Sequence, residues 1–255
     1  MGLAGRQDLL IPFGWMPAAG ALGFAPPGEW PLPEPPVVFV TNPVCLDKRS
    51  PAKDRVVIAY GGGLLLHTGW PNPGLRAVLK TFRLRWSRAN VPIWVHIMVE
   101  TAHQADQMVR QLEDVEGVMA IELGLPPECS ANEACGLVEA AQGEMPLILS
   151  LPIDRVGEPW VEQLGERAIS AISLSAPRGI LPAIDGSMIS GRLYGPGLLP
   201  QALRTLQRLK PLGLPLIVGS GVYRRTDIRV ALEGGAAAVQ LDSVLWRGWD
   251  EQECV

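Results

Sequence analysis

The chain has 255 residues, of which 47% are apolar and 19% are charged, and its net charge at pH 7 is −4. This length suits one large domain, and the slightly acidic charge argues against a nucleic acid partner, which requires a basic face. Apolar runs stay shorter than the roughly 18 residues that cross a bilayer, and the N-terminal residues MGLAGRQD lack the pattern of a secretion signal. We therefore expect a soluble cytoplasmic protein.

The first third of the chain alternates apolar runs with connections rich in proline and glycine. An apolar run at 15–19 ends in small residues, which let another surface approach the backbone closely. The proline-rich segment 25–36 predicts an ordered surface loop, and the β-branched run 37–41 predicts a strand buried on both faces. A hairpin strand at 55–60 leads into the glycine-rich connection 61–74. We expect this insertion, about 42–74, to fold over the functional face.

From residue 75 onward, helices and strands alternate regularly. Apolar residues at helical spacing predict helices at 75–89, 102–112, 132–141 and 159–168, and continuous apolar runs predict strands at 92–99, 118–123, 146–151 and 171–174. After a glycine-rich loop at 190–197 come a helix, a strand ending at Val218, a second helix and a strand at 236–243. Eight such strands predict one closed (β/α)8 TIM barrel over residues 1–255. Only residues 244–255 remain for the last helix, so a partner subunit is expected to cover that flank.

Small residues follow the last two strands. Gly219, Ser220 and Gly221 come after one strand, and Asp242 and Ser243 end the next. Free amides at the positive ends of helices bind phosphate groups, and barrels commonly bind them after strands seven and eight. The sequence therefore predicts a phosphate site in these two turns.

Few residues at the expected strand ends can carry acid–base chemistry. His67 lies in the glycine-rich connection and His96 ends an apolar strand, and either can transfer a proton near neutral pH. A buried structural histidine is an equally good interpretation of His96, and for Glu122 we favour a structural hydrogen bond. We expect free thiols and no metal site, because no pair spacing that suits zinc occurs among Cys45, Cys129, Cys135 and Cys254.

Short motifs recur along the chain in a shared order and spacing, at residues 19–20, 23–24, 62–65, 69, 72–74, 121–123, 178–179, 191–196 and 200–203 and in the last two turns. Together they resemble the class 1 dihydroorotate dehydrogenases, which are barrels that bind flavin mononucleotide (FMN). The resemblance implies that Ala19 and Gly20 lie against the isoalloxazine ring. It also implies that backbone amides hold the FMN phosphate near Gly195, Gly219, Ser220, Gly221, Asp242 and Ser243.

The chain departs from this family where the chemistry would occur. The family's cysteine or serine base aligns with Pro127, so that Cys129 can serve only if the loop slips. Asn42 and Ser150 replace two lysines that would stabilise reduced flavin and bind the carboxylate of orotate, and Leu66 replaces an asparagine that would contact the pyrimidine.

The expected phosphate site also departs from the family. Asp242 stands where glycine is usual, and a carboxylate repels a phosphate unless its side chain turns away. Arg192 also replaces a glycine, and its guanidinium is able to pair with a phosphate and so compensate.

We therefore predict a dihydroorotate dehydrogenase-like FMN oxidoreductase that acts on a substrate other than dihydroorotate. The catalytic candidates are His67 and Cys129, and the candidate substrate contacts are Asn72 and His96. The alternative hypothesis is a catalytically degenerate barrel that serves as a binding or scaffolding subunit. A phosphosugar isomerase or aldolase is a third, weaker hypothesis. In each case we expect a small-molecule ligand and association as a homodimer or with another subunit.

Overall fold

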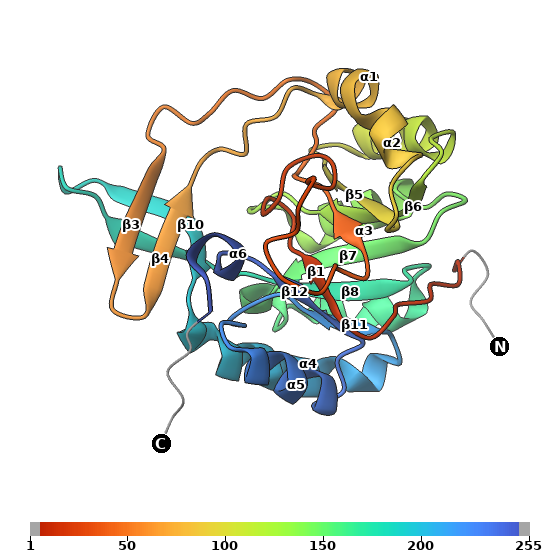
Figure 1. Ribbon diagram of the computed structural model, residues 1–255. Helices are drawn as coiled ribbons and strands as arrows, with labels where there is room; N and C mark the ends of the chain where they lie inside the picture. Colours follow the sequence, from red (N-terminus) through yellow and green to blue (C-terminus); the bar gives the residue numbers. More distant parts are fainter. Residues whose placement is uncertain (1–5, 250–255) are drawn as a thin grey trace.

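Eight parallel strands form the centre of the molecule (Figure 1). The computed structural model describes residues 6–249. Hydrogen bonds join the eight strands in the order β1-β12-β11-β8-β7-β6-β5-β2, and the Val37 amide donates to the Trp15 carbonyl at 2.9 Å, which brings the two end strands together. The predicted (β/α)8 barrel is confirmed. Its strands are β1 (Trp15–Pro17), β2 (Phe39–Val40), β5 (Ile93–Met98), β6 (Val118–Gly124), β7 (Leu147–Pro152), β8 (Ala171–Ser175), β11 (Leu216–Val218) and β12 (Ala238–Leu241).

Helices pack around the outside of the barrel. They are α1 (Leu75–Trp86), α2 (Ala102–Glu113), α3 (Ala131–Ala140), α4 (Leu199–Leu209), α5 (Arg225–Glu233) and the short α6 (Val244–Arg247), with single 3-10 turns at η1 (Ile153–Arg155), η3 (Pro196–Leu198) and η4 (Lys210–Leu212). Their starts follow ordinary capping rules: the Thr101 side chain accepts from the Gln104 amide, and Ser130 and Glu133 form a capping box. No helix of the described chain is long and apolar enough to cross a membrane.

One predicted α-helix was wrong in type. The segment expected to be helical at 159–168 is the 3-10 helix η2 (Pro159–Glu166). Gly165 within this short segment weakens an α-helix because glycine loses more backbone freedom on folding than other residues. The tighter turns still bury Trp160, Val161 and Leu164 against the core.

A second sheet of four antiparallel strands stands beside the barrel (Figure 1). Its strands are β3 (Val56–Tyr60), β4 (Gly63–His67), β10 (Met188–Tyr194) and β9 (Arg178–Pro182), in the order β3-β4-β10-β9. Two expectations were therefore wrong, because the segments 61–74 and 190–197 each contribute a strand rather than forming only a glycine-rich loop. A Cβ on Gly63 would lie 1.8 Å from the Tyr194 carbonyl oxygen. The glycine there lets β4 and β10 approach each other.

The barrel interior is apolar at one level. Each of the eight strands contributes at least one residue to this layer, which contains Met16, Val38, Val40, Trp94, Ala120, Ile148, Ala171, Ile217 and Ala238. Because side chains in a strand alternate between faces, the residue two positions further on points into the barrel again, closer to the carboxyl end. That next layer defines the mouth of the barrel.

Candidate functional site

A polar layer lies directly above the apolar layer of the barrel. Two residues beyond Trp94, Ala120, Ile148, Ala171 and Ala238, the strands carry His96, Glu122, Ser150, Ser173 and Gln240, all of them buried. Burying polar side chains is costly unless they form hydrogen bonds. We therefore expect these side chains to form hydrogen bonds, in a layer distinct from the apolar core.

Glu122 is the centre of this polar layer. Its carboxylate accepts hydrogen bonds from His96 Nδ1 at 2.6 Å, from the Ser173 hydroxyl at 2.6 Å and from Gln240 Nε2 at 2.7 Å. Burial by itself raises the pKa of the Glu122 carboxyl, but these hydrogen bonds and the charge of His96 hold it below its ordinary value. The network keeps Glu122 ionised and orients the His96 ring. A carboxylate that orients a histidine is an arrangement suited to proton transfer.

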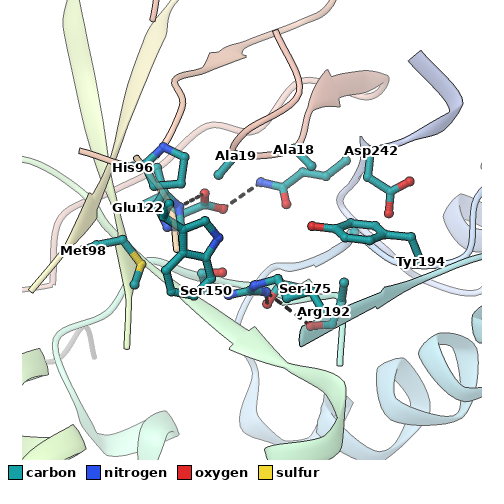
Figure 2. A pocket seen from close by; sticks show the side chains of 15 residues that line it. Ala18, Ala19, His96, Met98, Glu122, Ser150, Ser175, Arg192, Tyr194 and Asp242 are labelled. Atoms are coloured by element: carbon teal, nitrogen blue, oxygen red, sulfur yellow. Dashed lines mark hydrogen bonds and ion pairs between the residues drawn. The ribbon is translucent and has the colours of Figure 1, made fainter. Parts of the chain in front are cut away.

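Four cavities open at the mouth around this layer. The inner cavity, of about 40 Å³, lies over the polar layer and is lined by His96, Glu122 and Ser150 (Figure 2). The alanine-side cavity, of about 370 Å³, lies beside residues 18–21. The hairpin cavity lies beside residues 66–70, and the loop cavity lies beside residues 125–131.

Trp70 and Arg192 line all four cavities. The Arg192 guanidinium lies 5.0 Å from the centre of the Trp70 ring, in a cation–π contact. Within residues 6–249, Trp70 is the one non-glycine residue with a left-handed backbone, at φ 49°. Strained residues of this kind cluster at functional sites. The Trp70–Arg192 pair therefore divides one mouth into four compartments.

Asn72 holds Trp70 in this conformation. Its side-chain amide donates to the Trp70 carbonyl at 3.2 Å, and its Oδ1 accepts from the amides of Cys45 and Gly74 at 3.1 Å. Asn72 is buried and is not among the residues that line the four cavities. Its position supports a role in shaping the loop rather than in contacting a ligand.

The two catalytic candidates lie in different compartments. His67 lines the hairpin cavity, where its Nε2 lies 3.2 Å from Asp54 Oδ1. Cys129 lines the loop cavity, where its Sγ accepts from Arg155 Nη1 at 3.1 Å. The structure therefore does not bring these residues together, and neither lies in the inner cavity with His96. Cys254 lies outside the described residues.

The turns after β11 and β12, residues 219–221 and 242–243, form what we call the cup. Asp242 is buried in it, with 5% of its surface exposed. Its Oδ1 accepts from the Ser243 amide and from the Ser243 hydroxyl, whereas its Oδ2 is buried without a hydrogen-bond partner among the described residues. Burial, partly offset by the hydrogen bonds from Ser243 and by the nearby Val244 amide, raises the pKa of Asp242 from its ordinary 3.8 to about 6.

Comparisons with known proteins agree with this architecture. The catalytic subunit of dihydroorotate dehydrogenase B (NAD(+)) from Desulforudis audaxviator is 24% identical over 223 residues, which cover 79% of this chain and 72% of the relative. The corresponding subunit from Pyrococcus furiosus is 25% identical over 230 residues, which cover 81% and 74%. A dihydroorotate dehydrogenase from Eimeria tenella, solved in complex with ferulenol, superposes with a TM-score of 0.70 at 12% identity over 92% of this chain and 77% of that one. No protein-family model matches the chain.

The chain is a dihydroorotate dehydrogenase-like barrel. Its relatives by sequence are named as oxidoreductases, and its fold is that of a solved dihydroorotate dehydrogenase. This dihydroorotate dehydrogenase-like barrel departs from the family in the residues that line its mouth.

One end of the expected FMN site has room and the other does not. Ala19 and Gly20 line the alanine-side cavity, which suits a flat ring. In the cup, however, the Ser243 amide that would face a phosphate already donates to Asp242. The side chain of Asp242 has not turned away, so a phosphate in this position would meet a carboxylate.

Arg192 does not compensate for Asp242. Its guanidinium donates to the Ser175 hydroxyl at 3.4 Å and to the Ala176 carbonyl at 3.2 Å, at the end of β8 rather than in the cup. The residues of the cup therefore do not fit an FMN phosphate in the manner that the resemblance implies. The conflict at Asp242 could be recognised in the sequence, but the direction of its side chain could not.

The glycines of the predicted phosphate site have packing roles. A Cβ on Gly195 would lie 2.0 Å from the Gly62 carbonyl oxygen, and one on Gly221 would lie 2.1 Å from the Leu199 amide nitrogen. Gly219 lines the inner cavity beside Gln240. The Ser220 hydroxyl is buried without a hydrogen-bond partner in the described chain. Gly195 lines none of the four cavities.

Proposed function

We propose that this barrel binds a small molecule at its mouth and has lost the flavin chemistry of the dihydroorotate dehydrogenases. The observation that carries the proposal is the buried carboxylate of Asp242, which takes up the Ser243 amide of the cup. An anion already present in an anion site opposes a second one, because two like charges in a poorly hydrated site repel strongly.

Dihydroorotate is a poor substrate for this mouth. The chain has Pro127 at the position of the family's base and Asn42 and Ser150 at the positions of its lysines. Proton removal needs a group that accepts a proton within hydrogen-bond reach, and proline has none. The buried His96–Glu122 pair remains as the acid–base group of the inner cavity, and we propose that it contacts the bound molecule there.

A visible absorption spectrum tests the proposal. We expect the purified full-length chain to be colourless and to remain so after incubation with FMN and removal of unbound flavin. The variant Asp242→Gly frees the Ser243 amide and removes the charge, so it is expected to bind FMN more tightly than the wild type by about tenfold or more. A yellow wild-type protein whose flavin is reduced by a small donor would contradict the proposal.

A second candidate is the one that the sequence predicts, an FMN oxidoreductase acting on a substrate other than dihydroorotate. Its support is the alanine-side cavity beside Ala19 and Gly20, together with the names of the relatives. In that case the assays would begin with alanine variants of His67 and Cys129.

A further inference from the structure

Two opposite charges face the alanine-side cavity without pairing. Arg192 and Asp242 both line it, yet none of the ion pairs within residues 6–249 joins them. Figure 2 shows the Tyr194 ring between them. Both charges also act on this phenol: burial raises the pKa of Tyr194, the charge of Arg192 lowers it, and Asp242 raises it further.

Asp242 requires a hydrogen-bond donor. Its Oδ2 is buried and has no partner in the described chain, and its Oδ1 is occupied by Ser243. A buried acceptor without a partner is destabilising, and more so when it is charged. The group that relieves this cost carries an N–H or O–H, and an ammonium group relieves it best because it also neutralises the carboxylate. A phosphate dianion does the opposite.

Arg192 has no carboxylate partner among the described residues. Its guanidinium donates only to neutral oxygens among the hydrogen bonds of the described chain, those of Ser175 and Ala176. Arg178 stands directly opposite it in the β9–β10 register, and burial together with the charge of Arg192 lowers the pKa of Arg178. Two adjacent guanidinium groups repel each other, and a bound carboxylate reduces that repulsion.

The wall between the two charges is apolar and aromatic. It includes the side chains of Trp70, Tyr194 and Trp246, with Leu66 and Pro43 beside them. Aromatic rings stabilise both apolar groups and cations that lie over their faces. A ligand that reaches from Asp242 past the Tyr194 ring to Arg192 therefore has an apolar body between its charged ends.

We propose that the alanine-side cavity binds a zwitterionic amino acid whose ammonium group and carboxylate are separated by an apolar body. The ammonium group donates to Asp242 Oδ2, and the carboxylate accepts from Arg192. This inference deepens the proposed function and rests on it, because an FMN ring would occupy the same cavity.

Three matched compounds test the proposal by calorimetric titration of the full-length chain. Para-(aminomethyl)benzoate carries both charges, para-methylbenzylamine carries only the ammonium group, and para-toluate carries only the carboxylate. We expect the zwitterion to bind at least about tenfold more tightly than either singly charged compound, since a hydrogen bond to a charged group contributes about 1.5–3 kcal/mol.

Two variants test the contacts of the two charged ends of the ligand separately. Asp242→Asn is expected to weaken the zwitterion and the amine about tenfold or more while leaving para-toluate unchanged, and Arg192→Gln is expected to do the reverse. Arg76→Gln, on the exposed side of α1, is the control and is expected to change none of the three. Retained binding of para-toluate by Asp242→Asn also verifies that this variant is folded.

The proposal is overturned if para-toluate binds as tightly as the zwitterion, if Asp242→Asn has no effect, or if none of the compounds binds at millimolar concentration. A parallel titration with FMN distinguishes a failure of the proposed function from a failure of this inference alone. Tight FMN binding removes the proposed function and this inference with it, whereas a colourless protein that does not distinguish the three compounds removes this inference alone.

Discussion

At the scale of single residues, the proposed ligand site depends on Asp242. Its position at the end of β12 follows from the barrel, and any residue there faces the cup. Glycine would leave the backbone amide of Ser243 free, whereas the carboxylate takes that amide for itself. With glycine, the Ser243 amide would be free to donate to a bound acceptor such as a phosphate. With aspartate, the carboxylate is itself an acceptor, so the cup suits a bound donor.

The buried charge of Asp242 has a stability consequence that pH reveals. Its pKa is about 6 in the folded chain against an ordinary 3.8, so the folded state holds this proton more tightly than the unfolded state. The corresponding stability is fully present below the ordinary pKa and is lost as pH rises through about 6, at a cost of about 2–3 kcal/mol. We expect Asp242→Asn to be more stable than the wild type at neutral pH by up to this amount.

Urea unfolding at a series of pH values measures this effect. The gain of Asp242→Asn is expected to shrink as pH falls from neutral towards 4 and to vanish below that. A gain that is constant across this range would mean that the amide improves packing instead. A loss at neutral pH would contradict the assignment of a destabilising buried charge.

At this scale the sequence shows which residues stand at the mouth of the barrel, but not which side chains they contact. The conflict between Asp242 and a phosphate was visible in the sequence, and a hydrogen-bonded Glu122 was expected from it. The three hydrogen bonds that hold Glu122 come from β5, β8 and β12. These partners are far apart in the chain, and no local pattern relates them. Trp70 was missed as a lining residue because its position depends on an unusual backbone conformation.

At the scale of elements, the apolar runs predicted the strands of the barrel. The glycine-rich segments of the outer sheet predicted loops, so two of its strands were missed. A strand buried on both faces has a continuous apolar sequence, so its signal is local. Strands β4 and β10 are instead partly exposed, contain glycine, and pair across more than a hundred residues of sequence. Glycine is usually a mark of loops, but here it allows two backbones to come close.

The substitution Gly63→Ala tests this explanation of the glycines. The added Cβ would lie 1.8 Å from the Tyr194 carbonyl oxygen, and that neighbour is backbone that cannot rotate away. We expect a loss of about 1–3 kcal/mol in the free energy of unfolding and faster amide exchange in β4 and β10. Gly61→Ala, in the turn of the same hairpin, is the matched control because its Cβ would meet nothing within 4 Å.

Equal effects of the two alanine substitutions would show that backbone entropy, not the close approach of the strands, explains Gly63. Faster exchange spread evenly over the barrel strands would contradict the idea that β4 and β10 form a unit of their own.

At the scale of the whole molecule, the outer sheet connects the mouth to an exposed apolar surface. The register places Val57, Leu66, Arg192 and Arg178 side by side on one face. Leu66 and the two arginines line the mouth, whereas Val57 is 61% exposed. Ile180 and Met188, on the same face by the alternation of strand side chains, are 60% and 64% exposed. Large exposed apolar side chains on one sheet face favour a protein contact.

We therefore expect the chain to associate through this sheet face, either as a homodimer or with another subunit. Light scattering after gel filtration is expected to give twice the monomer mass for the wild type. The double variant Ile180→Asp and Met188→Asp is expected to elute as a monomer that keeps the far-UV circular dichroism spectrum of the wild type, because both side chains are already exposed to water in the monomer.

Leu84→Asp, which changes an equally exposed side chain on α1, is the control for a general effect of added charge and is expected to keep the mass of the wild type. If the wild type is itself a monomer at micromolar concentration, self-association through this face is wrong. If both variants dissociate, added charge weakens association in general, and the assignment of the contact to this sheet face fails. Since the same face reaches the mouth through Leu66 and Arg192, a contact here would also bury one edge of the ligand site, and the double variant would then bind the zwitterion less tightly than the wild type does.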